Sequence, residues 1–271
     1  MGRDRRVIGQ LLGAAAVPAL LLGARPRTAG GVVFAYHDIG PDGSDATSYL
    51  LPARMLRRHL EAVRGWGLRL VDLGELTGAV REGRPLDGMV AVTFDDACQG
   101  VTRYAIPVLH ELGVPATVFA VSGVRGATPT WAPPGTRTMT TQELAEAARS
   151  GLRIGSHTRS HPDLLSLDEG ALDAELAGSR ADLEEVVDGR VDHLTYPFGH
   201  HDERVRAAAR RAGYDAAFTF LDGRVEATLD RYRLPRLTMY GGHHRVRLAY
   251  QLARPASSWP DHQLDRVAAA T

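Results

Sequence analysis

Lysine is missing from this sequence, so all 32 of its Lys and Arg residues are arginine. Schiff-base catalysis, pyridoxal chemistry and P-loop nucleotide sites all depend on a lysine amine, and these classes are therefore excluded. The sequence also has no G-x-G-x-x-G dinucleotide fingerprint and no G-x-S-x-G nucleophile elbow. Cysteine is almost as scarce, because Cys98 is the only one, and no disulfide within the chain can hold the fold together.

Composition and charge narrow the class of partner. The chain has 271 residues, 44% of them hydrophobic and 24% charged, which is ordinary for a globular protein. Residues 1–30 contain five arginines and one aspartate, and the rest of the chain contains 27 arginines and 31 acidic residues. The resulting net charge of about −4 argues against nucleic acid or an anionic membrane as the main partner.

Residues 1–30 predict a targeting segment. Arg3, Arg5 and Arg6 precede VIGQLLGAAAVPALLLG, an apolar stretch that is short for a membrane span and is interrupted by glycines and Pro18. It resembles a twin-arginine export signal. The alternative is an uncleaved signal anchor, which would confine any membrane association to this segment. We expect an exported, extracytoplasmic protein that is either secreted or anchored.

Past residue 30, strand and helix patterns alternate as far as residue 240. Strands are expected at 31–39, 68–73, 89–94, 115–121, 152–157, 193–199, 215–220 and 232–239, and helices at 51–67, 74–82, 100–113, 140–151, 168–189 and 202–213. Residues 122–139, rich in Gly, Pro and Thr, predict a long loop. About seven β–α units without a linker or repeat predict one barrel-like α/β domain over 31–240, followed by a C-terminal tail over 241–271.

Potential metal ligands follow two of the expected strands. Asp95 and Asp96 come directly after MVAVTF, and two adjacent buried carboxylates need water, a proton, hydrogen bonds or a metal. His157 and His161 follow LRIGS, and a helical turn between them would bring both imidazoles to one metal. On an exposed helix such a pair is usually unrelated to metal, but the strand-end position favours a site. One aspartate and two histidines form a ligand set typical of catalytic zinc-type centres, which leaves the other aspartate free to act as a base.

The motifs TFDD and HTRSH, in this order, resemble those of the polysaccharide deacetylases, the NodB-homology group of metal-dependent carbohydrate esterases. The resemblance covers roughly residues 31–240. It implies a distorted (β/α) barrel that hydrolyses an acetyl group, usually the N-acetyl group of a glucosamine polymer. It also implies that Asp95 is the general base and that Asp96, His157 and His161 hold a divalent metal. Zinc is the first expectation, and Ni²⁺, Co²⁺ and Fe²⁺ also suit this ligand set.

Three departures from the family pattern carry further expectations. Ala97 stands where the family usually has glycine, so a modest local shift is expected. The third motif is HLTYPFG and lacks the usual arginine, so we expect Arg236 to orient Asp95 instead. Pro197, Phe198 and Gly199 should still form a wall of the substrate groove, with the Phe198 backbone N–H helping to hold an oxyanion.

The third departure concerns the general acid, because no Leu-x-His motif follows residue 240. His37, in VVFAYHDIG, instead ends the first expected strand. This resembles the circularly rearranged subgroup that includes exported poly-β-1,6-N-acetylglucosamine deacetylases of biofilm bacteria. His37 is therefore the candidate acid that protonates the leaving amine. The alternative is a histidine that merely caps a strand.

The remaining conspicuous residues have plainer interpretations. Trp131, in the long loop, is expected either to stack on a sugar ring or to pack over the barrel edge. Trp66 is expected in the core, and the Cys98 thiolate is disfavoured beside two carboxylates. For the remaining histidine pairs, metal binding is the alternative, and the pair after PFG is near enough to touch substrate, but solvated surface is the default: His200, His201, His243 and His244.

Several functions remain open at this level. Within the carbohydrate interpretation, peptidoglycan, chitin and acetylated xylan are alternatives to β-1,6-linked N-acetylglucosamine, which the first-strand histidine favours. A hydrolase of non-sugar C–N bonds would use the same barrel, although the export signal favours a cell-surface polymer. An inactive glycan-binding homologue is the third class, and the complete set of candidate catalytic residues argues against it.

Overall fold

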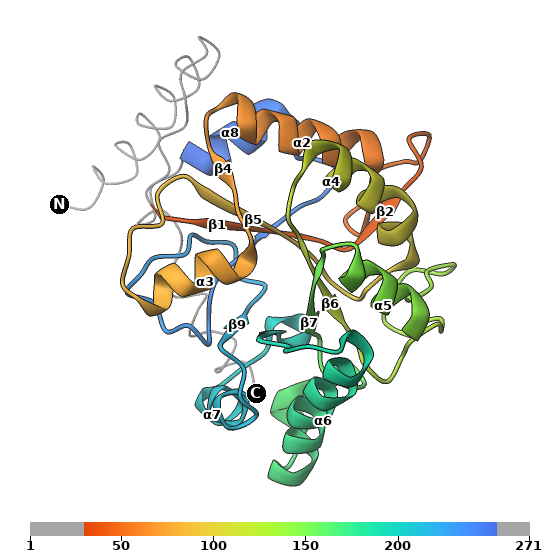
Figure 1. The fold of residues 1–271 in the computed structure, drawn as a ribbon, viewed down its shortest axis with the longest axis vertical. Coiled ribbons are helices and arrows are strands. Elements are labelled where there is room, and N and C mark those ends of the chain that lie inside the picture. The colour runs from red at the N-terminus through yellow and green to blue at the C-terminus, as the bar shows by residue number, and fades with distance from the viewer. Residues whose placement is uncertain (1–29, 254–271) are drawn as a thin grey trace, which may run out of the picture.

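The computed structural model describes residues 30–253, and a row of seven parallel strands runs through it in the order β10-β1-β5-β6-β7-β8-β9 (Figure 1). The short strand β4 pairs with β5 outside this row, and β2 pairs with β3 in a separate ribbon. The strands are β1 (Val32–Tyr36), β2 (Asp38–Gly40), β3 (Leu50–Pro52), β4 (Arg69–Leu70), β5 (Met89–Phe94), β6 (Thr117–Ala120), β7 (Arg153–Ser156), β8 (His193–Thr195), β9 (Ala216–Phe218) and β10 (Leu237–Thr238).

Helices surround the strands, as the βαβ pattern predicts (Figure 1). They are α2 (Ala53–Gly65), α3 (Leu73–Arg81), α4 (Ile106–Leu112), α5 (Thr141–Arg149), α6 (Glu169–Val187), α7 (Glu203–Arg211) and α8 (Arg245–Ala253), with a π-helical turn η1 (Val101–Ala105) and 3₁₀ turns η2 (Leu164–Ser166) and η3 (Pro197–Gly199). Thr140 caps the N-terminus of α5, because its side chain accepts the Glu143 N–H and the Glu143 carboxylate accepts the Thr140 N–H.

The central strands are buried on both faces, which explains their continuous apolar sequence. All six residues of β5 and all five of β1 are buried. Alternate side chains enter different clusters: Val90, Val92 and Phe94 pack in the larger one, whereas Met89 and Ala91 pack in the smaller one. The expected single α/β domain with about seven barrel strands is confirmed.

The last strand segment connects the two edges of the row. Leu234 forms a parallel bridge with Phe218 at the end of β9, and three residues later Leu237 pairs with Phe34 of β1. Arg236 lies between these two contacts, so closure of the barrel places its side chain inside. The strand expected at 232–239 is shorter than predicted, because its two halves pair with different neighbours and only Leu237–Thr238 forms β10.

The folded part of the chain extends beyond residue 240, where the sequence predicted a tail. Arg245–Ala253 forms α8, which packs against α2 and buries Leu248, Ala249 and Leu252. The predicted export signal over 1–30 lies outside the described residues except for its last position, as does the tail from residue 254 onwards. Within 30–253, no helix combines the length and the apolar character that crossing a membrane requires.

Acidification should destabilise this fold through its buried histidines. Burial lowers the pKa of His193 to about 4, whereas an imidazole in an unfolded chain titrates near ~6.5. Between these values the unfolded state binds more protons, so the free energy of unfolding falls as the pH falls, by about 1.4 kcal/mol per pH unit for each such histidine. Urea unfolding measured at pH 7, 6 and 5 tests this.

A His193→Gln variant is the control. It should take up as much as one proton fewer on unfolding, so its free energy of unfolding should depend less steeply on pH. The same slope in both proteins would contradict the assignment to His193.

Candidate metal centre and active site

Two strand ends on either side of β6 supply the site. Asp95 and Asp96 follow β5, and His157 follows β7, so their side chains meet at the carboxyl edge of the row. The chain turns sharply after β5, with φ values of 64° at Asp96 and 47° at Ala97. A left-handed conformation is costly for a residue with a Cβ atom. Glycine therefore suits this position, and the alanine that this chain has at position 97 holds the backbone in a strained conformation.

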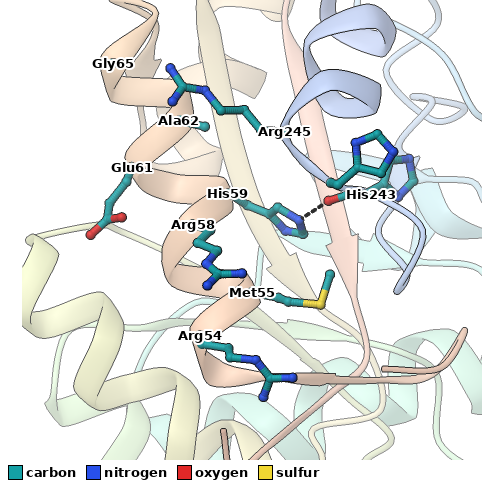
Figure 2. A pocket seen from close by; sticks show the side chains of 10 residues that line it. Arg54, Met55, Arg58, His59, Glu61, Ala62, Gly65, His243 and Arg245 are labelled. Atoms are coloured by element: carbon teal, nitrogen blue, oxygen red, sulfur yellow. Dashed lines mark hydrogen bonds between the residues drawn. The ribbon is translucent and has the colours of Figure 1, made fainter. Parts of the chain in front are cut away.

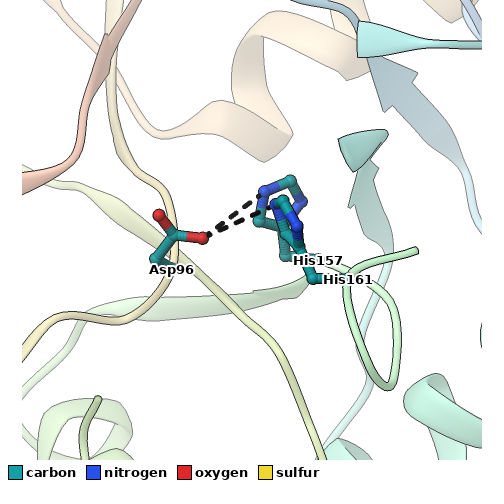
Figure 3. A group of neighbouring side chains, drawn as sticks. All are labelled: Asp96, His157 and His161. Carbon is teal, nitrogen blue, oxygen red and sulfur yellow. Dashed lines mark ion pairs between the residues drawn. The ribbon is translucent and has the colours of Figure 1, made fainter. Parts of the chain in front are cut away.

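Asp96, His157 and His161 form a compact group of potential metal ligands (Figure 3). One ligand atom from each residue lies within 4.8 Å of the others. The Oδ1 atom of Asp96 is 3.7 Å from Nε2 of His157 and 3.8 Å from Nε2 of His161. The three side chains are at most 6% exposed.

The segment between the histidines is not the helical turn that we expected. Thr158 and His161 both have a left-handed backbone, with φ values of 69° and 61°. The Thr158 hydroxyl accepts the His161 N–H at 3.1 Å and fixes this turn. The imidazoles of His157 and His161 consequently lie nearly perpendicular, at 82° and with centroids 4.7 Å apart. The four-residue spacing thus brings both rings together by a different local geometry.

Hydrogen bonding leaves the histidine nitrogens ready to bind a metal. Nδ1 of His157 is 2.9 Å from the Thr195 carbonyl oxygen. A carbonyl only accepts, so Nδ1 carries the proton and the lone pair of a neutral ring is on Nε2. Burial is the largest cause that lowers the pKa of His161 to about 4, and the neighbouring His157 adds to it, so the His161 ring is neutral. Two imidazoles and a carboxylate fit a divalent cation of the zinc type.

Two aromatic residues from loops hold Asp96. The Tyr49 hydroxyl donates to Oδ2 of Asp96 at 2.7 Å, and the Trp131 indole N–H donates to Oδ1 at 2.9 Å. The Trp131 ring also stacks on His161, with centroids 4.2 Å apart and an angle of 7°. Trp131 therefore lies against the potential ligands, and its stacking on a sugar stays a prediction. Sequence reasoning missed Tyr49, which no motif marks.

Asp95 and Arg236 make the expected contact as a bidentate ion pair. Both oxygen–nitrogen distances are 2.8 Å, and both side chains are fully buried. Arg236 also donates to the Thr195 hydroxyl at 2.7 Å and to the Thr219 carbonyl at 3.0 Å. Burial by itself would raise the pKa of Asp95, but the Arg236 guanidinium holds the pKa below its ordinary value. Asp95 is therefore an ionised carboxylate beneath the site.

His37 lines the pocket at the same site. Its ring packs between Tyr49 and Phe220, with centroids 4.8 Å and 5.5 Å away. Its Nδ1 atom is buried without a hydrogen-bond partner in the described structure. Burial, the largest effect, lowers the pKa of His37, so its imidazole is neutral near pH 7.

A pocket of about 370 Å³ opens onto these groups. It is lined by His37, Tyr49, Asp96, Trp131, His157, His161, Phe198 and Phe220. Phe198 is 52% exposed and projects from the 3₁₀ turn η3. Its expected companions in the groove wall, Pro197 and Gly199, are buried beneath it.

The expectations for the other conspicuous residues were partly right and partly wrong. Trp66 lies in the core as expected, and burial raises the pKa of the Cys98 thiol. His201 and His243, however, are buried at 3% and 1% exposure, so their expected place on the solvated surface was wrong. His201 stacks on Tyr196, which accounts for its burial.

Comparison with known proteins decides the family. The family model described as polysaccharide deacetylase matches residues 82–217, half of the chain. The chain belongs to this family. The matched segment contains the two aspartates after β5 and the two histidines after β7, but not His37 or Arg236.

Curated relatives of this chain include two bacterial proteins. One is YxkH of Bacillus subtilis, whose name assigns it to the polysaccharide deacetylases; it is 25% identical over 211 residues, which span 78% of this chain and 71% of YxkH. The other is the poly-β-1,6-N-acetyl-D-glucosamine N-deacetylase of Staphylococcus epidermidis, 24% identical over 204 residues, which span 70% of this chain and 68% of the relative.

Solved structures share the fold of this chain. The Streptococcus pyogenes deacetylase PplD superposes with a TM-score of 0.71 at 20% identity, over 84% of this chain and 100% of PplD. IcaB from Ammonifex degensii gives a TM-score of 0.69 at 23% identity, over 83% of this chain and 98% of IcaB.

Proposed function

We propose that this protein is a metal-dependent hydrolase that removes acetyl groups from an N-acetylglucosamine-containing polysaccharide. The observation that carries the proposal is the buried group of Asp96, His157 and His161 beside an open pocket. The family supports deacetylation of a carbohydrate.

The residues divide into holding and reacting groups. Asp96, His157 and His161 would hold the metal, which when bound supplies a Lewis acid for the acetyl carbonyl and for water. Asp95, kept ionised by Arg236, accepts the proton of the attacking water. His37 donates a proton to the leaving amine. Because burial keeps His37 neutral at rest, it first takes up this proton from solvent in the pocket that it lines, and Asp95 afterwards releases its proton to solvent.

Two features favour β-1,6-linked N-acetylglucosamine as the substrate. The Staphylococcus epidermidis relative is named for that polymer. In addition, His37 reaches the pocket from the end of β1, which suits the rearranged subgroup in which the first strand supplies the acid. A cell-surface polymer also agrees with the export that we infer from residues 1–30.

The test is acetate release by the purified full chain from β-1,6- and β-1,4-linked N-acetylglucosamine oligomers, with and without a chelator. Chelator-sensitive release from the β-1,6 oligomer is expected. Preference for the β-1,4 oligomer would favour chitin or peptidoglycan as the substrate. No release from either oligomer by metal-loaded protein would reject the proposed substrate and turn attention to xylan esters and non-sugar amides.

The role of His37 makes a separate prediction. His37→Ala should slow amide cleavage by roughly 10²–10⁴-fold, the usual contribution of a general acid. Hydrolysis of an activated acetate ester should change much less, because its leaving group departs without a proton. The ratio of kcat values on the two substrates measures the effect. Equal losses on both would assign His37 to binding or folding.

A further inference from the structure

A second pocket lies between α2 and α8, and it shares no lining residue with the candidate active site (Figure 2). Its volume is about 630 Å³, a size that suits a small-molecule ligand. Arg54 and Arg58 face it from successive turns of α2, and Arg245 lies at the start of α8 (Figure 2). His243 lines the pocket just before α8 and is 1% exposed.

The hydrogen bonds around His243 fix the position of its proton. Its Nδ1 atom accepts the Tyr240 backbone N–H at 3.3 Å, so a neutral ring must carry its proton on Nε2. The Nε2 atom is buried, and no hydrogen-bond partner for it is found in the described part of the chain. His243 thus places a buried donor at the wall of this pocket that the described part of the chain does not satisfy, which is a costly arrangement.

His59 contributes no acceptor to the pocket. Its Nε2 atom is 2.6 Å from the His243 carbonyl, which only accepts, so Nε2 must donate (Figure 2). Its Nδ1 atom then accepts from the Tyr36 hydroxyl at 3.1 Å. Both ring nitrogens are therefore engaged within the protein, and this chain of bonds fixes the His243 carbonyl at the pocket wall.

The charged groups around the pocket are also donors. Arg54 has a buried Nη1 atom for which the described residues supply no hydrogen-bond partner, and Arg245 packs over the Trp66 ring at 5.9 Å. Across residues 30–253, no carboxylate forms an ion pair with Arg54, Arg58 or Arg245. Glu61 is the one acidic residue among those lining the pocket. The N-terminus of the nine-residue helix α8 adds a positive dipole end.

We propose that this pocket binds a phosphate-type oxyanion, either free or carried as the phosphoryl group of a larger molecule. Three arginines, an unsatisfied imidazole N–H and a helix N-terminus match an acceptor-only ligand. An inorganic anion fills only part of the volume, and the rest of the pocket accommodates the carrier. The site is independent of the deacetylase centre and of the function proposed for it.

Isothermal titration of the full chain with inorganic phosphate and with a hexose phosphate, at constant ionic strength, tests this proposal. The informative variant is Arg54→Gln/Arg58→Gln, and the matched control is Arg57→Gln. Arg57 is on the same helix, but it pairs with Glu111 and does not line the pocket. Because a metal at the catalytic centre could bind phosphate too, each titration is repeated after chelator treatment.

We expect saturable binding that is the same with and without chelator treatment. The affinity should fall at least about tenfold in the Arg54→Gln/Arg58→Gln variant and stay unchanged in Arg57→Gln. Tighter binding of the hexose phosphate would identify a carried phosphoryl group, and equal or weaker binding would identify a free anion. Absence of saturable binding for both probes, or an equal loss in both variants, would overturn the proposal.

Discussion

Asp95→Asn should retain bound metal and lose deacetylase activity by roughly 10²–10⁴-fold, the contribution usual for a general base. An amide does not accept the proton of the attacking water, whereas the three potential ligands Asp96, His157 and His161 are untouched. Metal content and kcat on an N-acetylglucosamine oligomer are the two measurements. A variant that lost metal together with activity would place Asp95 among the ligands.

The matched control is Asp163→Asn, which removes the same charge from a side chain that is 42% exposed and pairs with His200. It should retain near wild-type kcat. Because Asp95→Asn also leaves Arg236 without an anionic partner, circular dichroism must first show that the variant is folded. Near-normal turnover by folded Asp95→Asn would remove Asp95 from the role of base.

Arg236→Met should lower the free energy of unfolding by about 3–5 kcal/mol, because it leaves a fully buried carboxylate without its cation. Urea unfolding at neutral pH measures this loss. Without Arg236, burial raises the pKa of Asp95. A carboxyl group with a raised pKa gains a proton more readily in the folded state. The difference in the free energy of unfolding between the wild type and Arg236→Met should therefore become smaller as the pH falls.

Two further variants separate this ion pair from a general loss of packing. Asp95→Asn/Arg236→Met should cost less than the sum of its two single changes, because the two buried groups interact directly. Arg190→Met removes an arginine that is 67% exposed and should change stability by about 0.5 kcal/mol or less. Additive losses in the double variant would show that the ion pair itself contributes little.

The elements with strong local patterns could be predicted from the sequence. The strand expected at 89–94 has the same bounds as β5, and the helix expected at 140–151 contains α5. The ligand group at the strand ends followed from the same patterns, because parallel strands align their carboxyl ends. The contact of Arg236 with Asp95 was also expected, although 141 residues separate them.

Other long-range contacts, and one local turn, could not be predicted. Tyr49 and Trp131 lie in loops, and their bonds to Asp96 arise only when distant segments meet. The turn between the two candidate ligand histidines adopts a left-handed geometry that a four-residue spacing does not reveal. His243 is buried just before α8, which packs on α2, whereas residues 241–271 were expected to form a tail.

The pairing of β10 with β1 also constrains how the protein is assembled during synthesis. Asp95 emerges early, yet its cation Arg236 arrives only after most of the domain has been made. Until then β1 lacks one neighbouring strand and the Asp95 carboxylate lacks its cation. Burying β5 fully therefore adds little stability to a partly made chain. Final consolidation is therefore a late and cooperative event that involves both ends of the domain. A chain that ends before Arg236 should remain open, exposed to proteases, and without a working site.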